Sequence, residues 1–139
     1  MLGEIVLESA GRITNVKVLE AAGENSKVEV SLQGQGKLLG TGMMEIASYW
    51  QQARANGTFY GEGGPVWMTE SGDVLSWSGF GTGRPTGPGF SATYAVCGTI
   101  QTNAKAYAHL AGIATVGEYQ VDEAGNYQWT LWEWKPAGV

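Results

Sequence analysis

The chain has 139 residues, among them 22 glycines and one cysteine, and its formal net charge is −5 at pH 7. This length fits one domain, residues 1–139, whose core needs no metal or disulfide for stability. The acidic balance excludes electrostatic attraction to nucleic acid or anionic lipid, and no stretch approaches the roughly 18 apolar residues of a membrane helix. Because one cysteine forms no internal disulfide and no secretion signal opens the chain, we expect a cytoplasmic location.

Alternation of apolar and polar residues, the pattern of a half-buried strand, runs through most of the chain. The nine predicted strand segments are 4–9, 13–19, 27–33, 41–50, 58–70, 74–81, 90–102, 111–119 and 127–135. The first two are either separate strands or one bent strand with a break near Ala10 and Gly11. Short turn signals separate the later segments, which predicts an up-and-down meander of antiparallel strands.

Three stretches allow other structures. Residues 44–54 are rich in good helix formers, so a short helix is the alternative to a strand there. Residues 103–110 are rich in alanine and fit either a helical turn or a broad loop. Residues 79–89 hold five glycines and two prolines, which predicts a long exposed loop. As a mobile lid, this loop would leave Arg84 available to meet a ligand carboxylate or simply water.

The Asn-Gly pair at residues 56–57 is preferred in two-residue hairpin turns, since both central residues take positive φ. Counting outward from this turn places Glu45 opposite Met68 and Met43 opposite Glu70. The four side chains then share one face, unless a bulge at the nearby glycines shifts the register. An inward carboxylate would be desolvated and suited to acid or base chemistry, so Glu45 and Glu70 are candidate catalytic residues. Solvated carboxylates on the outer face are the alternative.

Glycines recur inside the predicted strands, where they weaken a flat sheet but permit the sharp coiling that lets a sheet close on itself. Closure also removes the exposed edges that a long meander would present. We therefore expect an all-β fold, an antiparallel up-and-down barrel of about eight strands. Its lumen would be just wide enough for side chains or one small ligand.

Glycine placement and strand rhythm between about residues 34 and 135 also carry a resemblance. The residues concerned are Gly40-Thr41-Gly42, Asn56-Gly57, Gly61-Glu62-Gly63-Gly64, Ser78 to Gly83 and Leu110 to Tyr119. This succession resembles that of bacterial uncharacterised proteins with an allene oxide cyclase-like, calycin-type barrel. The resemblance implies an eight-stranded barrel, a lumen that takes an apolar or amphipathic small molecule, and frequent self-association. It does not imply cyclase activity, because one fold hosts many functions.

Large aromatic residues on the predicted strands are the candidates for ligand contact. Tyr94 lies on the apolar face of residues 90–101, where its hydroxyl would orient a bound carbonyl or carboxylate. Trp67 and Trp77 lie on neighbouring strands and would line the same pocket, at the lumen or the barrel mouth. Simple filling of the lumen by these rings is the alternative.

The last predicted strand carries large apolar groups on both faces. Trp129 and Leu131 lie on one face, and Trp132 and Trp134 lie on the other. In a monomeric barrel the outer face of each strand contacts water, so the large apolar side chains on the outer face of this strand should be covered by another part of the structure. We expect either a second subunit, most simply in a homodimer, or the N-terminal segment to do so.

No cofactor or metal motif emerges from the residues. One histidine and one cysteine exclude metal sites built on several such ligands, and the glycines of residues 79–89 lack the spacing of a dinucleotide motif. We therefore expect a β-barrel that binds a small apolar or amphipathic molecule, with lyase- or cyclase-like activity as a possible addition. The alternatives are a sugar-binding jelly-roll module and a structural or oligomeric protein with a filled lumen.

Overall fold

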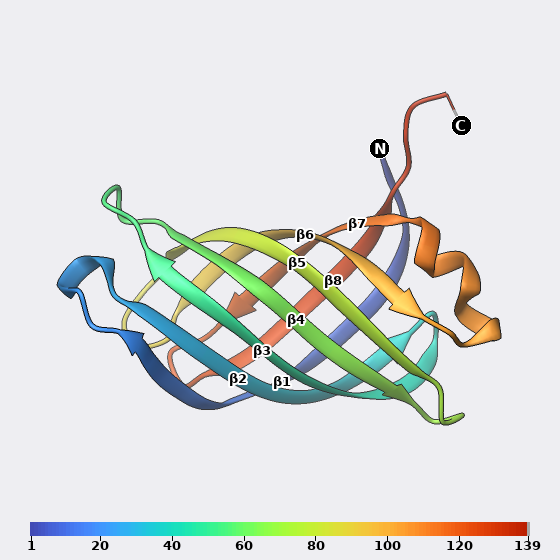
Figure 1. The fold of residues 1–139 in the computed structure, drawn as a ribbon, viewed down its shortest axis with the longest axis horizontal. Helices are drawn as coiled ribbons and strands as arrows, with labels where there is room; N and C mark the ends of the chain where they lie inside the picture. The colour runs from blue at the N-terminus through green and yellow to red at the C-terminus, as the bar shows by residue number, and fades with distance from the viewer. Residues whose placement is uncertain (139) are drawn as a thin grey trace.

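Eight antiparallel strands close into one barrel in the computed structural model, which describes residues 1–138 (Figure 1). Each strand pairs with the next one along the chain, and β1 closes the barrel on β8. The strands are β1 (Leu2–Glu20), β2 (Lys27–Leu38), β3 (Thr41–Ala53), β4 (Phe59–Thr69), β5 (Val74–Pro85), β6 (Ala92–Thr102), β7 (Ala114–Val121) and β8 (Asn126–Trp134). The predicted all-β up-and-down barrel is confirmed, and its continuous meander is not the topology of a jelly roll.

Several predicted boundaries change. The first two predicted segments form the single long strand β1. Residues 44–53 belong to strand β3 and not to a helix. The predicted loop at 79–89 is wrong over most of its length, because β5 continues to Pro85 and pairs with β6 from Leu75 to Pro85. The alanine-rich stretch forms the 3-10 helix η2 (Lys105–Gly112), and a shorter one, η1 (Gly23–Asn25), precedes β2.

Glycines inside β5 and β6 allow close packing instead of making a loop. Gly79 and Gly98 pair directly, and the Trp77 side chain lies against both. A Cβ on Gly79 would come within 2.6 Å of the Trp77 ring, and one on Gly98 within 2.4 Å. Because no side chain fits at such distances, the glycines make room for an indole inside the barrel. The many glycines in this segment therefore indicate crowded strands rather than a loop.

The turn between β3 and β4 has three residues rather than two. The Arg54 N–H donates to the Thr58 carbonyl oxygen at 2.8 Å, so residues 55–57 form the loop. Gly57 alone in this loop has a positive φ, of 81°. The Asn56 side chain accepts a hydrogen bond from the Thr58 N–H at 3.1 Å, which holds the turn without the mirror-image geometry of a two-residue loop.

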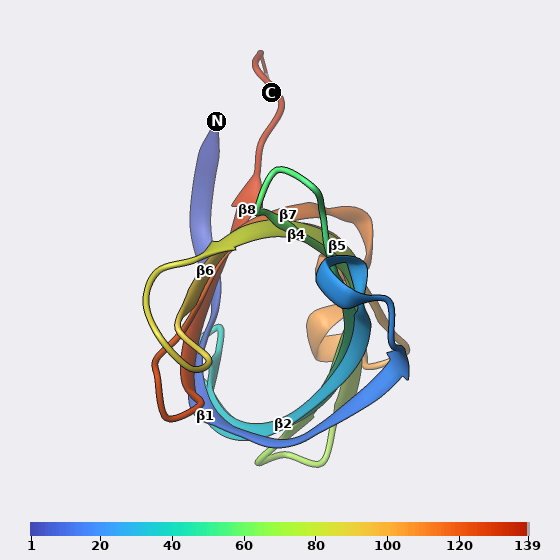
Figure 2. The same ribbon diagram turned by 90° about the vertical axis from the view of Figure 1, so that its left-hand side faces the viewer.

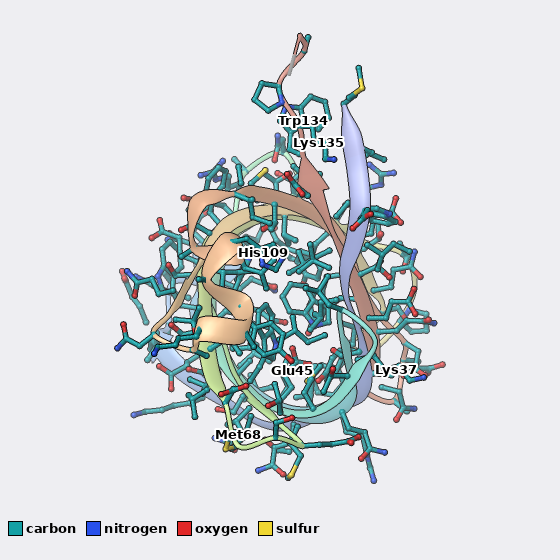
Figure 3. All side chains as sticks on the ribbon, turned by 90° about the vertical axis from the view of Figure 1, so that its right-hand side faces the viewer. Lys37, Glu45, Met68, His109, Trp134 and Lys135 are labelled. Atoms are coloured by element: carbon teal, nitrogen blue, oxygen red, sulfur yellow. The ribbon has the colours of Figure 1, made fainter. Side chains whose placement is uncertain are left out.

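This extra loop residue shifts the β3–β4 register by one. Glu45 faces Trp67 rather than Met68, and Met68 pairs with Met44. Successive residues of a strand point to opposite faces, so the shift leaves Glu45 inside the barrel and Glu70 outside. In Figure 3, Glu45 lies within the ring of strands and Met68 outside it. The predicted shared face of Glu45 and Glu70 is therefore wrong.

The two ends of the barrel differ. Helix η2 lies across one end of the barrel (Figure 3). Its Tyr107 and Leu110 side chains are buried. These side chains belong to the hydrophobic core, which at this end also includes Leu38, Leu75 and Ile100. At the opposite end, hairpins, loops and η1 join the strands around the rim (Figure 2). None of the helices in residues 1–138 is long and apolar enough to cross a bilayer.

Candidate functional site

Glu45 is a buried carboxylate inside the barrel, with 1% of its surface exposed. The indole N–H groups of Trp67 and Trp129 donate to its Oε1 at 2.9 and 2.8 Å. The hydroxyls of Ser9 and Tyr127 donate to its Oε2 at 2.5 and 2.6 Å. Four such bonds fill the acceptor sites of an ionised carboxylate and replace the water that burial removes.

Strand register brings these groups together. Trp67 is the direct partner of Glu45 on β4, and Gly34 is its partner on β2. A Cβ on Gly34 would lie 2.2 Å from the Tyr127 hydroxyl, so the missing side chain leaves the space through which Tyr127 reaches Glu45. The other two donors face each other across the β1–β8 ladder. The carboxylate, on β3, is thus held by donors from three other strands, β1, β4 and β8, and only closure of the barrel makes that possible.

A cavity of about 80 Å³ lies inside the barrel, beside Glu45. Its inward-facing aromatic lining comprises Tyr49, Trp77, Tyr94, Tyr119, Tyr127 and Trp129. Gln51, near the end of β3, adds an amide to this lining. The volume exceeds the roughly 10–15 Å³ that one water needs, so the cavity has room for several waters or for part of a small ligand.

Four tyrosine hydroxyls make the cavity polar at defined points. Tyr94 donates to Gln51 Oε1 at 2.5 Å, and the hydroxyls of Tyr49 and Tyr119 lie 3.0 Å apart. The contact between these two hydroxyls uses one of their two protons, and Tyr49 also hydrogen-bonds with Tyr94. Burial raises the pKa of all four tyrosines, and the Glu45 charge adds to the rise for Tyr127. Each is therefore a neutral donor at physiological pH.

The predicted site residues divide between the inside and the outside of the barrel. Trp77 and Tyr94 line the cavity, while Trp67 is fully buried against Glu45. Glu70 is exposed beyond the end of β4, and Arg84 is exposed on β5. The structure therefore brings Glu45, but neither Glu70 nor Arg84, to the cavity.

Sequence reasoning missed Ser9, Tyr119 and Tyr127 as parts of the site. Tyr119 and Tyr127 lie on the inward faces of β7 and β8, next to residues whose alternation is visible in the sequence. In the sequence, only the alternation of apolar and polar residues indicated that these two tyrosines face inward. What brings Ser9 and Tyr127 together at Glu45 is the pairing of β1 with β8, which joins residues more than 100 positions apart.

Within residues 1–138, no group of three or more His, Cys, Asp or Glu side chains is placed to hold a metal ion. The only ionisable side chain that we place within the lumen lining is Glu45, with the four tyrosines around it. The chemistry that the site offers is therefore hydrogen-bond donation and contact with aromatic rings around one buried acid.

Several solved structures share this fold at low sequence identity. A conserved protein of unknown function from Rhodopseudomonas palustris has a TM-score of 0.77 and 17% identity, over 96% of this chain and 97% of that one. A protein with unknown function from Clostridium acetobutylicum has a TM-score of 0.80 and 9% identity, over 95% and 98%. A β-barrel-like protein from Acinetobacter baumannii has a TM-score of 0.79 and 12% identity, over 97% and 96%.

No protein-family model and no curated protein matches the chain. At identities of 17% or less, the likeness to the solved structures concerns the fold alone. By fold, the chain is similar to uncharacterised β-barrel proteins from bacteria.

Proposed function

We propose that this protein binds a small apolar or amphipathic molecule in the cavity beside Glu45. The observation that carries the proposal is the unequal filling of the barrel. Apolar side chains and η2 fill one end, whereas aromatic rings and Gln51 surround a space of about 80 Å³ toward the other. An apolar ligand body would contact the rings, and a ligand oxygen would accept a hydrogen bond from a tyrosine hydroxyl of the lining.

The polar groups favour this function over a filled structural lumen. Phenylalanine would fill the same space without a hydroxyl that must be satisfied, yet tyrosine stands at all four positions around the cavity. The hydroxyls make specific hydrogen bonds, to Glu45, to Gln51 and between Tyr49 and Tyr119, which a merely space-filling core does not need. We include a cytoplasmic location in the proposal, which the exposed free thiol of Cys97 favours.

A cavity-filling variant tests the proposal. Ala47 lines the cavity on β3, whereas Ala95 is exposed on β6. We expect wild-type protein to bind benzyl alcohol in calorimetric titration, Ala47→Leu to lose this binding, and Ala95→Leu to retain it. Native mass spectrometry of protein from its own host should likewise find a retained small molecule in wild type and not in Ala47→Leu. Equal behaviour of the two variants would contradict a lumen site.

Lyase- or cyclase-like activity is a second candidate, which the resemblance to allene oxide cyclase-like barrels suggests. The contact between Glu45 Oε2 and the Tyr127 hydroxyl, 2.6 Å long, favours it because an acid and a phenol share a proton-transfer distance beside the cavity. In this case Glu45 acts through Tyr127, and Glu70 has no part. Any turnover found with a bound molecule should vanish in Tyr127→Phe while binding of that molecule persists.

A further inference from the structure

We propose that the cavity selects a small quaternary ammonium cation over neutral and anionic molecules of the same shape. The inference rests on the proposed ligand-binding function and names the chemical class of the ligand. Three features of the site carry it: an acid without a cationic partner, a lining without basic side chains, and aromatic rings around the space.

The first feature is the uncompensated charge of Glu45. Its Oε1 faces two indole N–H groups, which donate only, so a proton on that oxygen would find no acceptor. The four bonds are all satisfied when Glu45 is an ionised carboxylate. Hydrogen-bond donors spread a negative charge but do not cancel it, and all four partners are neutral side chains. In this arrangement, with the Ser9 and Tyr127 hydroxyls donating to Oε2, Glu45 is an anion beside the cavity.

The second feature is the absence of basic side chains from the cavity lining within residues 1–138. The lining includes no Lys, Arg or His, and the side chain of its other acidic residue, Glu62, is exposed on the outer face, where it accepts a hydrogen bond from Tyr60. Lys27 lies over the Trp50 ring, 4.1 Å from its centroid, and Arg54 lies 4.4 Å from the centroid of another ring. Neither Trp50 nor those cations line the cavity. An anionic ligand would thus meet the Glu45 charge without a counter-charge.

The third feature is the arrangement of the rings. Tyr49 and Tyr119 lie 5.8 Å apart with their planes at 85°, and Trp77 and Trp129 lie 5.4 Å apart at 79°. Rings at nearly right angles differ in orientation around the cavity, and a cation is attracted to any ring face that is turned toward it. Aromatic side chains around a negatively charged carboxylate form the kind of site that recognises quaternary ammonium groups.

The occupied acceptors of Glu45 favour a fully substituted ammonium over a primary one. Each Glu45 oxygen already accepts two hydrogen bonds, so an ammonium N–H directed at it would find no free acceptor site. A quaternary ammonium has no N–H to satisfy. It gains from the charge and the rings without needing a hydrogen bond.

Three molecules of matched shape test the inference: choline, its neutral carbon isostere dimethylbutanol, and the anionic dimethylbutanoate. In calorimetric titration of wild-type protein, we expect choline to bind at least about tenfold more tightly than dimethylbutanol, and dimethylbutanoate most weakly. Equal binding of choline and dimethylbutanol would overturn the inference while supporting the proposed function. Binding of none of the three at millimolar concentration would overturn both.

Variants locate the source of the preference. In Glu45→Gln, the amide oxygen still accepts from the indoles of Trp67 and Trp129, and the amide NH₂ can donate to the hydroxyls of Ser9 and Tyr127. Circular dichroism should therefore show an intact fold. The affinity of this variant for choline should lie within about twofold of its affinity for dimethylbutanol, so most of the cation preference would be lost. Glu118→Gln removes the same charge from an exposed position on β7 and should keep the preference. Equal selectivity in both variants would exclude Glu45 as the source.

A second variant keeps the test sharp if Glu45→Gln does not fold. Tyr94→Leu removes a cavity ring near the start of β6 and leaves the four donors to Glu45 in place. It should weaken choline binding by more than dimethylbutanol binding, because only the cation gains from the ring face. An equal loss for both molecules would count against the proposed cation site.

Discussion

Gly34 on β2 has no side chain, and this leaves room for the Tyr127 hydroxyl that donates to Glu45. Gly34 pairs with Glu45, and a Cβ there would lie 2.2 Å from the Tyr127 hydroxyl and 2.5 Å from the Ala10 carbonyl oxygen. The first of these atoms could rotate away, but the second belongs to the backbone of β1. Gly34 is therefore required both by the site and by the close approach of two strands.

We expect Gly34→Ala to destabilise the protein by about 2–4 kcal/mol, from overpacking and from loss of the hydrogen bond of Tyr127 to a charged group. Urea unfolding measures this effect. Gly112→Ala is the control, since a Cβ there meets nothing within 4 Å and should change stability by less than about 0.5 kcal/mol. If the two variants unfold at the same urea concentration, the crowding at Gly34 does not constrain the fold.

At the scale of the strands, the cavity is built by tyrosines from four of them. Tyr49 comes from β3, Tyr94 from β6, Tyr119 from β7 and Tyr127 from β8. Tyr94 and Tyr119 are direct cross-strand partners, with ring centroids 5.2 Å apart. Tyr49 and Tyr127 each lie with their ring centroid 5.8 Å from that of Tyr119, so the four rings pack in one layer around it, where burial keeps their hydroxyls protonated.

This layer predicts a loss of stability in alkali. Burial raises the pKa of Tyr49, Tyr94, Tyr119 and Tyr127 above the ordinary value of about 10. Their stabilising contribution is fully present below about pH 10 and falls above it, because the unfolded chain then releases protons that the folded chain retains. Urea unfolding against pH, with tyrosinate absorbance, measures this fall.

Tyr94→Phe removes one of the four groups and should make the alkaline loss shallower. Wild-type stability that stayed constant above pH 10 would show that the four hydroxyls ionise equally in the folded and unfolded states.

At the scale of the whole molecule, apolar side chains remain on the outer wall where the barrel closes. Leu2 pairs with Trp134 and Ile5 with Trp132, and of these Leu2 is 57% exposed and Trp134 47%. The N-terminal strand lies beside β8 in the same wall and does not lie over its outer face (Figure 1). A second subunit is thus the cover that we propose for this face.

We expect a dimer at micromolar concentration in light scattering, and a monomer after Trp134→Glu, because a buried unpaired carboxylate disfavours the contact. Gln120→Glu adds the same charge at another exposed outer position and should leave the dimer intact. A monomeric wild-type protein whose tryptophans are readily quenched by iodide would rule out self-association through this face.

The sequence by itself determined the fold class and much of the strand layout. Two-residue alternation reports which side of a strand is buried, and interior glycines report closure, so the barrel and the lumen position of Tyr94 could both be predicted. These signals are local: each depends on residues within about ten positions of one another. The misread segment at 79–89 had the same local origin, since glycines that make room for Trp77 look like loop glycines.

Only the tertiary structure decided the site. One extra residue in the turn at 55–57 shifts the register of β4, which separates Glu70 from Glu45 and sets Trp67 beside it. Closure of β1 on β8 then delivers Ser9, Tyr127 and Trp129 to the same carboxylate. The physical reason is that a hydrogen-bond network depends on ångström-scale register between distant segments, whereas hydrophobic alternation records only which face of its own strand a residue occupies.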